Sequence, residues 1–475
     1  MSYSPCLTYF LDRLSGFSTN VFRLEAQNQD SASANKILRF TLPSNALLNM
    51  RSFALHFSAS TAGTAGGGRL PPKIDTLVDR VEVSCGGVQL SAGANFYNVL
   101  RHAKDALEGD KCDPLLGHPE MVRTKSYVDN GTALATTANE VYSALRKETQ
   151  FCIDHWEGFL GSCEPKILDS SLVPDLVVSI YLADNNVLST VAGPALSGTA
   201  GDLTMTEDGA GCTYTMANIH ATIECIGLGG ATYNNMVAGM IASAGFLEIP
   251  FKQYFAFQDS TASTMRFSVA TQSLDRIWVA HRAKDFGVQG GAVVVAGHKV
   301  AGAFVDDEAG QSAADIDIGV SSFDRGGVMD YNSEKYLSKF IDFPEPATTS
   351  TTKAMYQFQL NGAYYPQFRA TFEEMAQISK QSVNHSGKKP AYGLHTAKTN
   401  YSVQCIRLNM PESEYGRLIS GLDTRSVSLN GYYNMDNVQS TGTGGYIPTV
   451  NLFCECSSTL RIGSGKMLEV VQWIQ

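Results

Sequence analysis

The sequence has few charged residues for its length and no run of basic ones. Asp, Glu, Lys and Arg make up 17% of the 475 residues, against about 25% in an average protein. The net charge is −10, and the densest basic stretch is Gly-Lys-Lys at 387–389. Proteins that hold nucleic acid through its phosphates normally carry a basic face or tail. We therefore expect no direct nucleic-acid binding.

Long apolar runs are also missing. The sequence contains no stretch of about 18 consecutive apolar residues, the length that a membrane-spanning helix needs. Its first 17 residues lack a basic start, and Asp12 and Arg13 interrupt their apolar part, unlike a secretory signal peptide. These features predict a chain that is soluble and intracellular when made.

Motifs of catalysis and nucleotide binding are absent. "RIGSGKMLE" at 461–469 fails as a phosphate-binding loop, because Leu460 stands where the first Gly is needed and Met467 where Ser or Thr is needed. "GLGGAT" at 227–232 fails as a dinucleotide motif, because Thr232 replaces the last Gly. No HExxH, GxSxG or DxDxDG occurs. We predict no enzyme activity, no catalytic, cofactor-binding or metal-binding residues, and no cofactor.

Three weaker candidate sites are better explained as structural features than as catalytic or metal-binding sites. "DHWEG" at 154–158 is expected to be a loop or a helix end with Trp156 anchored in a core. The acidic run at 305–319 lacks regular ligand spacing and is expected to be a solvated loop, although whether it binds a cation stays open. His56 and His281 are expected to be hydrogen-bonded strand residues and not metal ligands.

The ten cysteines form no CxxC pair. Cys454 and Cys456 are two residues apart in a strand-like run, so their side chains should face the same way. We expect buried, reduced thiols.

Length and glycine content indicate the class of fold. A single core stops growing at roughly 250–300 residues, so a chain of 475 residues should form at least two domains. The 43 glycines, together with small polar residues between apolar runs, indicate many short strands joined by long loops.

Three short patterns occur twice, in the same order. Arg-Phe-Thr-Leu at 39–42 is echoed by Arg-Phe-Ser-Val at 266–269, and each precedes an aromatic strand-like run that contains His56 or His281. A strand, a Gly turn, a strand and a helix follow, around Gly87 in the first half and Gly362 in the second. Each half ends on a strand with Glu-Cys, at Glu224-Cys225 and Glu455-Cys456. The order indicates a structural repeat, and each copy should begin near its Arg-Phe pattern.

Helices are expected at four places. Apolar spacing predicts a short amphipathic helix at 4–17, a helix at 95–109, a helix between domains at 234–246 and a helix at 368–381 with Phe368 on its buried face. Long insertions are expected at 189–213 and 284–350.

Together these features predict an all-β fold of two tandem antiparallel eight-stranded jelly rolls, with a short helix in each and long loop insertions. The predicted boundaries are 1–20 for an N-terminal arm, 21–232 for the first jelly roll and 233–475 for the second.

The repeat carries a family resemblance. "VEVSCGGVQLSAGANFYNVL" at 81–100 is similar to the strand-turn-strand-helix segment of the double jelly-roll major capsid proteins, and "SLDRIWVAHRA" at 273–283 resembles a strand of their second domain. These proteins build tailless icosahedral viruses, among them adenoviruses, tectiviruses and large algal viruses. The resemblance spans about 20–470.

The resemblance implies a viral structural protein that acts in the virion. It implies a homotrimer with a pseudo-hexagonal outline that tiles an icosahedral capsid, with lateral capsomer contacts. It also implies penton and minor capsid proteins as partners and, in some relatives, an internal membrane. The insertions would form outer towers or trimer clasps, and the arm would face inward or grip a neighbour.

Two alternatives stay open. Another viral structural protein, such as a spike or a minor capsid β-protein, would be expected to show a shaft repeat or an attachment segment. A jelly-roll carbohydrate-active enzyme or lectin would need clustered metal ligands or paired carboxylates with aromatic platforms.

Overall fold

The fold is described from a computed structural model of the chain. The described residues run from 17 to 471, with gaps at 29, 63–67, 70–73, 92–94, 109–149, 188, 191–194, 197–201, 206–212, 229–230, 262, 283–294, 300–354, 384–402, 411–419, 426–429 and 437–448. The helix predicted at 4–17 and the acidic run at 305–319 therefore lie outside the described residues, except for Phe17.

The first unit, residues 17–228, is built on two antiparallel sheets of four main strands. Their strand orders are β1-β14-β4-β8 and β3-β10-β6-β7. The strands are β1 (Phe17–Glu25), β3 (Ile37–Thr41), β4 (Leu47–Ala62), β6 (Val78–Cys85), β7 (Val88–Ser91), β8 (Gln150–Ile153), β10 (Leu176–Leu182) and β14 (Thr213–Leu228). Two short strands extend the first sheet: β2 (Ser31–Ser33) pairs with β14, and β9 (Ile167–Asp169) pairs with β4.

The second unit, residues 246–471, repeats this plan. Its sheets have the orders β15-β23-β17-β21 and β16-β22-β19-β20. The strands are β15 (Phe246–Ser260), β16 (Thr264–Phe267), β17 (Leu274–Arg282), β19 (Met355–Leu360), β20 (Ala363–Thr371), β21 (Val403–Arg407), β22 (Gly431–Asp436) and β23 (Thr449–Gly463). A further strand, β24 (Leu468–Val471), pairs with β23.

The two units correspond strand for strand, in chain order and in sheet order. The predicted repeat is therefore confirmed, and so is an all-β architecture of eight main strands per unit. The Arg-Phe echo lies in β3 and β16, which are the second main strands of the units. The expectation that it lies near the first strand was wrong, because β1 and β15 precede it and had not been recognised in the sequence.

The predicted Gly turns are tight hairpins of one kind. Between β6 and β7, Gly86 and Gly87 have φ values of 54° and 86°. Between β19 and β20, Asn361 and Gly362 have φ values of 50° and 87°. Two consecutive residues with positive φ define the turn whose twist matches antiparallel strands, and Gly and Asn adopt it most easily.

One helix follows the fifth main strand of each unit, as predicted. These are α2 (Tyr97–Glu108) and α8 (Phe372–Ser382). The predicted start of α8 at 368 was wrong: Phe368 belongs to β20 and its side chain is exposed. The helix begins after Thr371, whose hydroxyl accepts from Glu374 N while the Glu374 carboxylate accepts from Thr371 N, a capping box that fixes this end.

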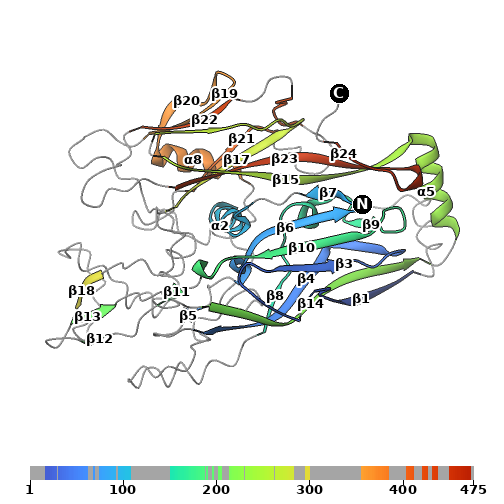
Figure 1. Cartoon of the computed structure of the whole chain (residues 1–475). Helices are drawn as coiled ribbons and strands as arrows, with labels where there is room; N and C mark the ends of the chain where they lie inside the picture. Colours follow the sequence, from blue (N-terminus) through green and yellow to red (C-terminus); the bar gives the residue numbers. More distant parts are fainter. Residues whose placement is uncertain are drawn as a thin grey trace, which may run out of the picture.

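A third helix, α5 (Ala231–Ala244), connects β14 to β15 at one end of the molecule (Figure 1). It confirms the helix predicted at 234–246, and the predicted boundary between residues 232 and 233 falls in its first turn. The division of the chain at these residues stays a prediction. Among the described residues the structure adds one α-helical turn, α4 (Phe159–Ser162), and three 3₁₀ turns: η1 (Ile74–Leu77), η3 (Asn185–Val187) and η5 (Ser464–Lys466).

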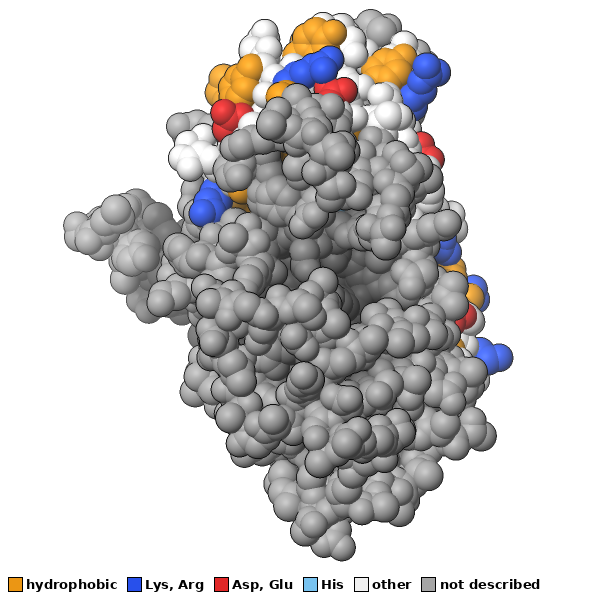
Figure 2. Space-filling view, turned by 90° about the vertical axis from the view of Figure 1, so that its left-hand side faces the viewer, with side chains coloured by type: hydrophobic (Ala, Val, Ile, Leu, Met, Phe, Trp, Pro, Cys, Tyr) orange, Lys and Arg blue, Asp and Glu red, His pale blue; other side chains and the backbone are white. Residues whose placement is uncertain are grey.

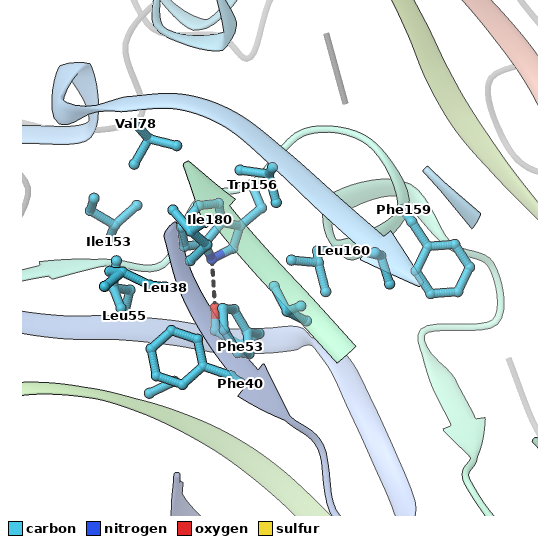
Figure 3. Close-up of a cluster of buried hydrophobic side chains, with 14 of the residues drawn as sticks. Leu38, Phe40, Phe53, Leu55, Val78, Ile153, Trp156, Phe159, Leu160 and Ile180 are labelled. Atoms are coloured by element: carbon cyan, nitrogen blue, oxygen red, sulfur yellow. Dashed lines mark hydrogen bonds between the residues drawn. The ribbon is translucent and has the colours of Figure 1, made fainter. Parts of the chain in front are cut away.

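Each sandwich encloses a buried core. In the first, Trp156 donates its indole N–H to the carbonyl of Phe53 at 2.8 Å, inside a cluster of aromatic and aliphatic side chains (Figure 3). The second core contains Cys454 and Cys456, which face the same way as predicted. The first core also takes in Phe251 of β15, so apolar contact continues across the two units.

The two long insertions meet. β13 (Asp202–Met205), from the insertion at 189–213, pairs with β18 (Val295–Lys299), from the insertion at 284–350. With β12 (Ala195–Leu196) they form a small three-stranded sheet beside the sandwiches (Figure 1). A second small sheet joins β5 (Gly68–Arg69) to β11 (Ser189–Thr190).

Candidate assembly interface

Helix α2 belongs to the first unit and lies between the two units (Figure 1). Four of its apolar residues are buried in a cluster with side chains of the second unit, among them Tyr254 and Trp278. The four are Val99, Leu100, Ala103 and Leu107, all of which the sequence spacing placed on one face. The helix therefore joins the units through the outer face of the sheet β15-β23-β17-β21.

The same helix carries two buried cations. Arg101 lies 3.2 Å and Lys104 lies 2.6 Å from the carboxylate oxygens of Glu157. Arg101 also contacts Asp75 at 3.5 Å, and Lys104 donates to the hydroxyl of Tyr254 at 3.1 Å. All five side chains are largely shielded from solvent. The Tyr254 contact extends the network from the first unit into the second.

The network continues on the second unit. Trp278 donates its indole N–H to Glu455 at 2.9 Å, and Arg276 lies 3.7 Å from the same carboxylate. Arg276 also lies 3.9 Å from Glu108 of α2, which is an ion pair between the units. The Nζ of Lys104 lies 5.8 Å from the centroid of the Trp278 ring.

The charges in this network depend on one another. Burial disfavours the ammonium of Lys104, but the carboxylates of Glu108, Glu157 and Glu455 outweigh it and raise its pKa. Burial likewise disfavours the carboxylate of Glu455, yet Arg276 and Lys104 lower its pKa. The opposite charges of the network therefore offset the cost of burial for both groups.

This arrangement favours a fixed relation between the units. A buried ion pair adds little net stability, but removing one partner leaves a buried charge without compensation. Sliding the units past one another would break the Arg276–Glu108 ion pair and separate Lys104 from Glu455. The apolar cluster supplies the attraction, and the charged network fixes the register.

Two surfaces outside this interface remain open on the chain. β1 is the edge of its sheet and exposes Val21 and Phe22, while β20 is an edge strand that exposes Tyr364 and Phe368. Figure 2 shows hydrophobic side chains next to Lys or Arg and Asp or Glu side chains at its top, over the second unit. Exposed apolar residues on edge strands are typical of contact surfaces.

Comparison with known proteins identifies the architecture. No family model matches the chain, and no curated protein sequence matches it. Among solved structures it is similar to VP54 of the virus PBCV-1, as fitted into a reconstruction of the virophage Sputnik, with a TM-score of 0.55 and 13% identity over 97% of both chains. The chain has the double jelly-roll fold. Faustovirus major capsid protein is also similar, with a TM-score of 0.47 and 9% identity over 94% of this chain and 91% of that one.

The double jelly roll places the segment "DHWEG" in the connection from β8 to α4. Trp156 is buried in the first core, as predicted, and the hydroxyl of Tyr97 accepts a hydrogen bond from the backbone N–H of Glu157 at 2.8 Å. The role of Glu157 in the network between the units was missed. Its partners are 53 and 56 residues away in the sequence, and no local pattern links them.

The two histidines singled out in the sequence are hydrogen-bonded strand residues, as predicted. His56 Nε2 lies 3.0 Å from the hydroxyl of Thr222, and its ring stacks on His220 at 5.1 Å. His281 Nε2 lies 3.1 Å from the hydroxyl of Tyr433 inside the second core. Within the described ranges, no group of three or more His, Cys, Asp or Glu side chains is placed to hold a metal ion.

A second buried polar cluster in the double jelly roll was not found from the sequence. Asp275 accepts from Lys252 at 2.5 Å and from Ser457 at 2.6 Å, while Ser273 donates to its other oxygen at 2.6 Å. Gly421 N–H in turn donates to Ser273 at 2.9 Å. These bonds satisfy the buried carboxylate and hold β15, β17 and β23 to a loop.

The cysteines agree with expectation where they are described. Six of the seven described thiols are buried, and all seven are free: Cys85, Cys163, Cys225, Cys405, Cys454 and Cys456 are buried and Cys152 is half-buried. Burial raises the pKa of Cys85 and of Cys163 to about 12. The part of the chain that is described also contains no helix with the length and apolar character needed to cross a membrane.

Proposed function

We propose that this chain is a major capsid protein. Three copies form a pseudo-hexagonal capsomer, and the capsomers tile an icosahedral virion shell. The observation that carries the proposal is the strand-for-strand correspondence of two jelly rolls joined by a buried interface, in a fold similar to that of VP54 over 97% of both chains.

The physical reason lies in the number of units. Each chain presents two similar units, so a ring of three chains presents six similar edges to its neighbours. Closed rings of identical chains form when a head-to-tail contact repeats through a rotation that closes. The network around Lys104 supports this role because it fixes the angle between the units, which a regular outline requires.

The fold also suits a protein made in quantity. A jelly roll pairs most strand edges within the chain and so limits wrong pairing with other copies. The proposal gives the chain other copies of itself as its main partner, penton and minor capsid proteins as further partners, and the virion as its place of action. The three-stranded sheet β12-β13-β18 would lie in the outer loops, and an internal membrane would lie below the shell.

Light scattering on the purified full-length chain tests the proposal. The expected mass is about 154 kDa, three times 51.3 kDa. Negative-stain electron microscopy of the same material should show particles with a hexagonal outline. A stable monomer of 51.3 kDa that hydrolyses or binds a glycan would contradict the capsid proposal and favour the enzyme or lectin alternative.

A further inference from the structure

Helix α5 lies at the end of the molecule opposite the small sheet β12-β13-β18 (Figure 1). We infer that this end, formed by α5 and the turn between β23 and β24, docks on the surface of a lipid bilayer. The inference rests on the proposed function, which puts the insertions on the outside of the shell and a membrane beneath it. It names the surface of the chain that touches that membrane.

The stretch of sequence that contains α5 carries no charge. Between Glu224 and Glu248 there is no Asp, Glu, Lys, Arg or His. A helix on the surface of a soluble protein normally turns a charged or polar face to water, and a helix that is apolar all round is normally buried. Most residues of α5 are Ala, Gly, Met, Val or Ile, so its composition is that of a buried helix.

The described side chains of α5 are nevertheless exposed. From 237 to 244 only Val237 is buried, and Ile241 is half-buried. Met240 is 50% exposed, and Phe246, which follows the helix, is 37% exposed. Large apolar side chains that gather on an exposed surface indicate a contact with another apolar surface.

The turn between β23 and β24 extends this apolar end of the molecule. Gly463 pairs with Phe246, and its N–H donates to the carbonyl of Met467 at 2.8 Å, so Met467 lies beside the end of α5. Met467 is 72% exposed. The same turn carries Lys466, which is exposed and forms no ion pair among the described residues. Exposed apolar side chains and an unpaired cation therefore lie together here.

Charged side chains border the patch on one side. The guanidinium of Arg461 lies 4.5 Å from the centroid of the Phe246 ring. Arg461 also pairs with Glu248 at 3.0 Å and with Glu469 at 3.9 Å, so it offsets the negative charge at this border. The patch therefore has an apolar centre and a polar edge without an excess of unpaired carboxylates.

The lack of hydrogen-bonding groups favours lipid over a protein partner. Protein interfaces carry about ten direct hydrogen bonds. Between 237 and 246 the only polar side chain is Ser243, and its hydroxyl already donates to the carbonyl of Met240 at 3.0 Å. A bilayer surface asks for no such bonds, because an interfacial helix is held by the apolar area that it buries and by its cations.

Lys466 is placed to contact the headgroups. A lysine stem lies along apolar surface while its ammonium stays in water. With Met467 buried at the edge of the acyl chains, the neighbouring ammonium of Lys466 would lie at the level of the phosphates, where it is attracted by anionic lipid. The patch thus combines the two contacts that hold a protein on a membrane surface.

Flotation of the purified full-length chain with lipid vesicles tests the inference. The wild type should float with vesicles of phosphatidylcholine and phosphatidylserine. Met240→Glu and Met467→Glu should each weaken vesicle binding about tenfold or more, because each removes buried apolar area and places a charge at the bilayer surface. Phe368→Glu, the same kind of change at an exposed position on β20, is the control and should bind as the wild type does.

Lys466→Gln separates the charge from the apolar contact. It should weaken binding to these vesicles about fivefold and leave binding to vesicles of phosphatidylcholine alone unchanged. An equal loss on both kinds of vesicle would contradict the role given to Lys466. All the substituted positions are exposed, so the urea midpoints of the variants should match that of the wild type.

Light scattering on the same samples separates this inference from the proposed function. A wild-type trimer that does not float contradicts membrane docking, favours a protein partner for α5 and leaves the capsid proposal standing. Flotation that Met240→Glu and Met467→Glu leave unchanged contradicts this surface in the same way. A monomer whose flotation those two substitutions abolish contradicts the trimer and supports the docking surface.

Discussion

Lys104 of the first jelly roll lies over the indole ring of Trp278 of the second, with its Nζ 5.8 Å from the ring centroid. The indole N–H of Trp278 in turn donates to Glu455 at 2.9 Å. The packing of α2 against the second unit thus places Lys104 of the first sandwich in one buried site with Trp278 and Glu455 of the second.

The first prediction concerns that cation. Lys104→Met should lower the free energy of unfolding by about 3–5 kcal/mol, because it leaves Glu157 and Glu455 buried without their shared partner. Urea denaturation followed by circular dichroism measures the change. Lys36→Met, at an exposed position, is the control and should change stability by less than about 0.5 kcal/mol. Equal effects of the two substitutions would contradict the role given to Lys104.

The second prediction separates packing from hydrogen bonding at Trp156. Its indole N–H donates a hydrogen bond to the carbonyl of Phe53. Phe53 lies in the irregular stretch of β4 where the pairing with β14 shifts register. Trp156→Phe should cost about 1–3 kcal/mol, because the buried carbonyl loses its donor. Trp156→Ala should cost about 3–5 kcal/mol, because it also leaves a cavity. Denaturant midpoints at constant slope measure both, and an unaffected Phe variant would show that the hydrogen bond is dispensable.

The third prediction concerns close packing at the second Arg-Phe strand. A Cβ at Gly431 would lie 2.5 Å from ring atoms of Phe267, so Gly431→Ala should destabilise the chain by about 1–3 kcal/mol. Gly239→Ala in α5 is the matched control, because a Cβ there meets no atom within 4 Å and Ala favours a helix. Thermal unfolding should show opposite shifts for the two variants. A Gly431→Ala chain as stable as the wild type would mean that the Phe267 ring can move aside at no cost, which would contradict the prediction.

The fourth prediction concerns pH. Burial, and then the neighbouring His220, lower the pKa of His56 below its ordinary value of 6.5. The unfolded chain therefore takes up the proton more readily than the folded one, and the stability contributed by neutral His56 is lost as the pH falls below about 6.5. Unfolding free energies measured between pH 7.5 and 5 should fall more steeply for the wild type than for His56→Gln. Identical slopes would show that His56 titrates alike in both states.

The sequence determined the parts of this fold that are set by neighbours in the chain. The spacing of Val99, Leu100, Ala103 and Leu107 fixes one apolar face of α2, because residues three and four apart lie together on a helix. Gly87 and Gly362 mark hairpins because few residues accept a positive φ. Cys454 and Cys456 face one core because a strand alternates sides.

Edge strands and helix ends were harder to predict from the sequence. β1 was missed because its edge position leaves Val21 and Phe22 in the open and weakens the alternation of buried and exposed residues. The start of α8 was misplaced because Phe368 continues the apolar spacing backwards, while pairing of β20 with β19 keeps it in a strand. In both cases the partner strand, and not the segment itself, sets the outcome.

Tertiary structure alone decided what joins the two jelly rolls. Lys104, Glu157 and Glu455 are spread over the chain, and nothing near any of them in the sequence selects the other two. Folding removes water from these charges, and the opposite charges that offset this cost come within reach only in the assembled interface. The sequence by itself determined a repeated β-fold with its helices and turns; the packing of α2 between the units decided how the two copies of that fold are held as one body.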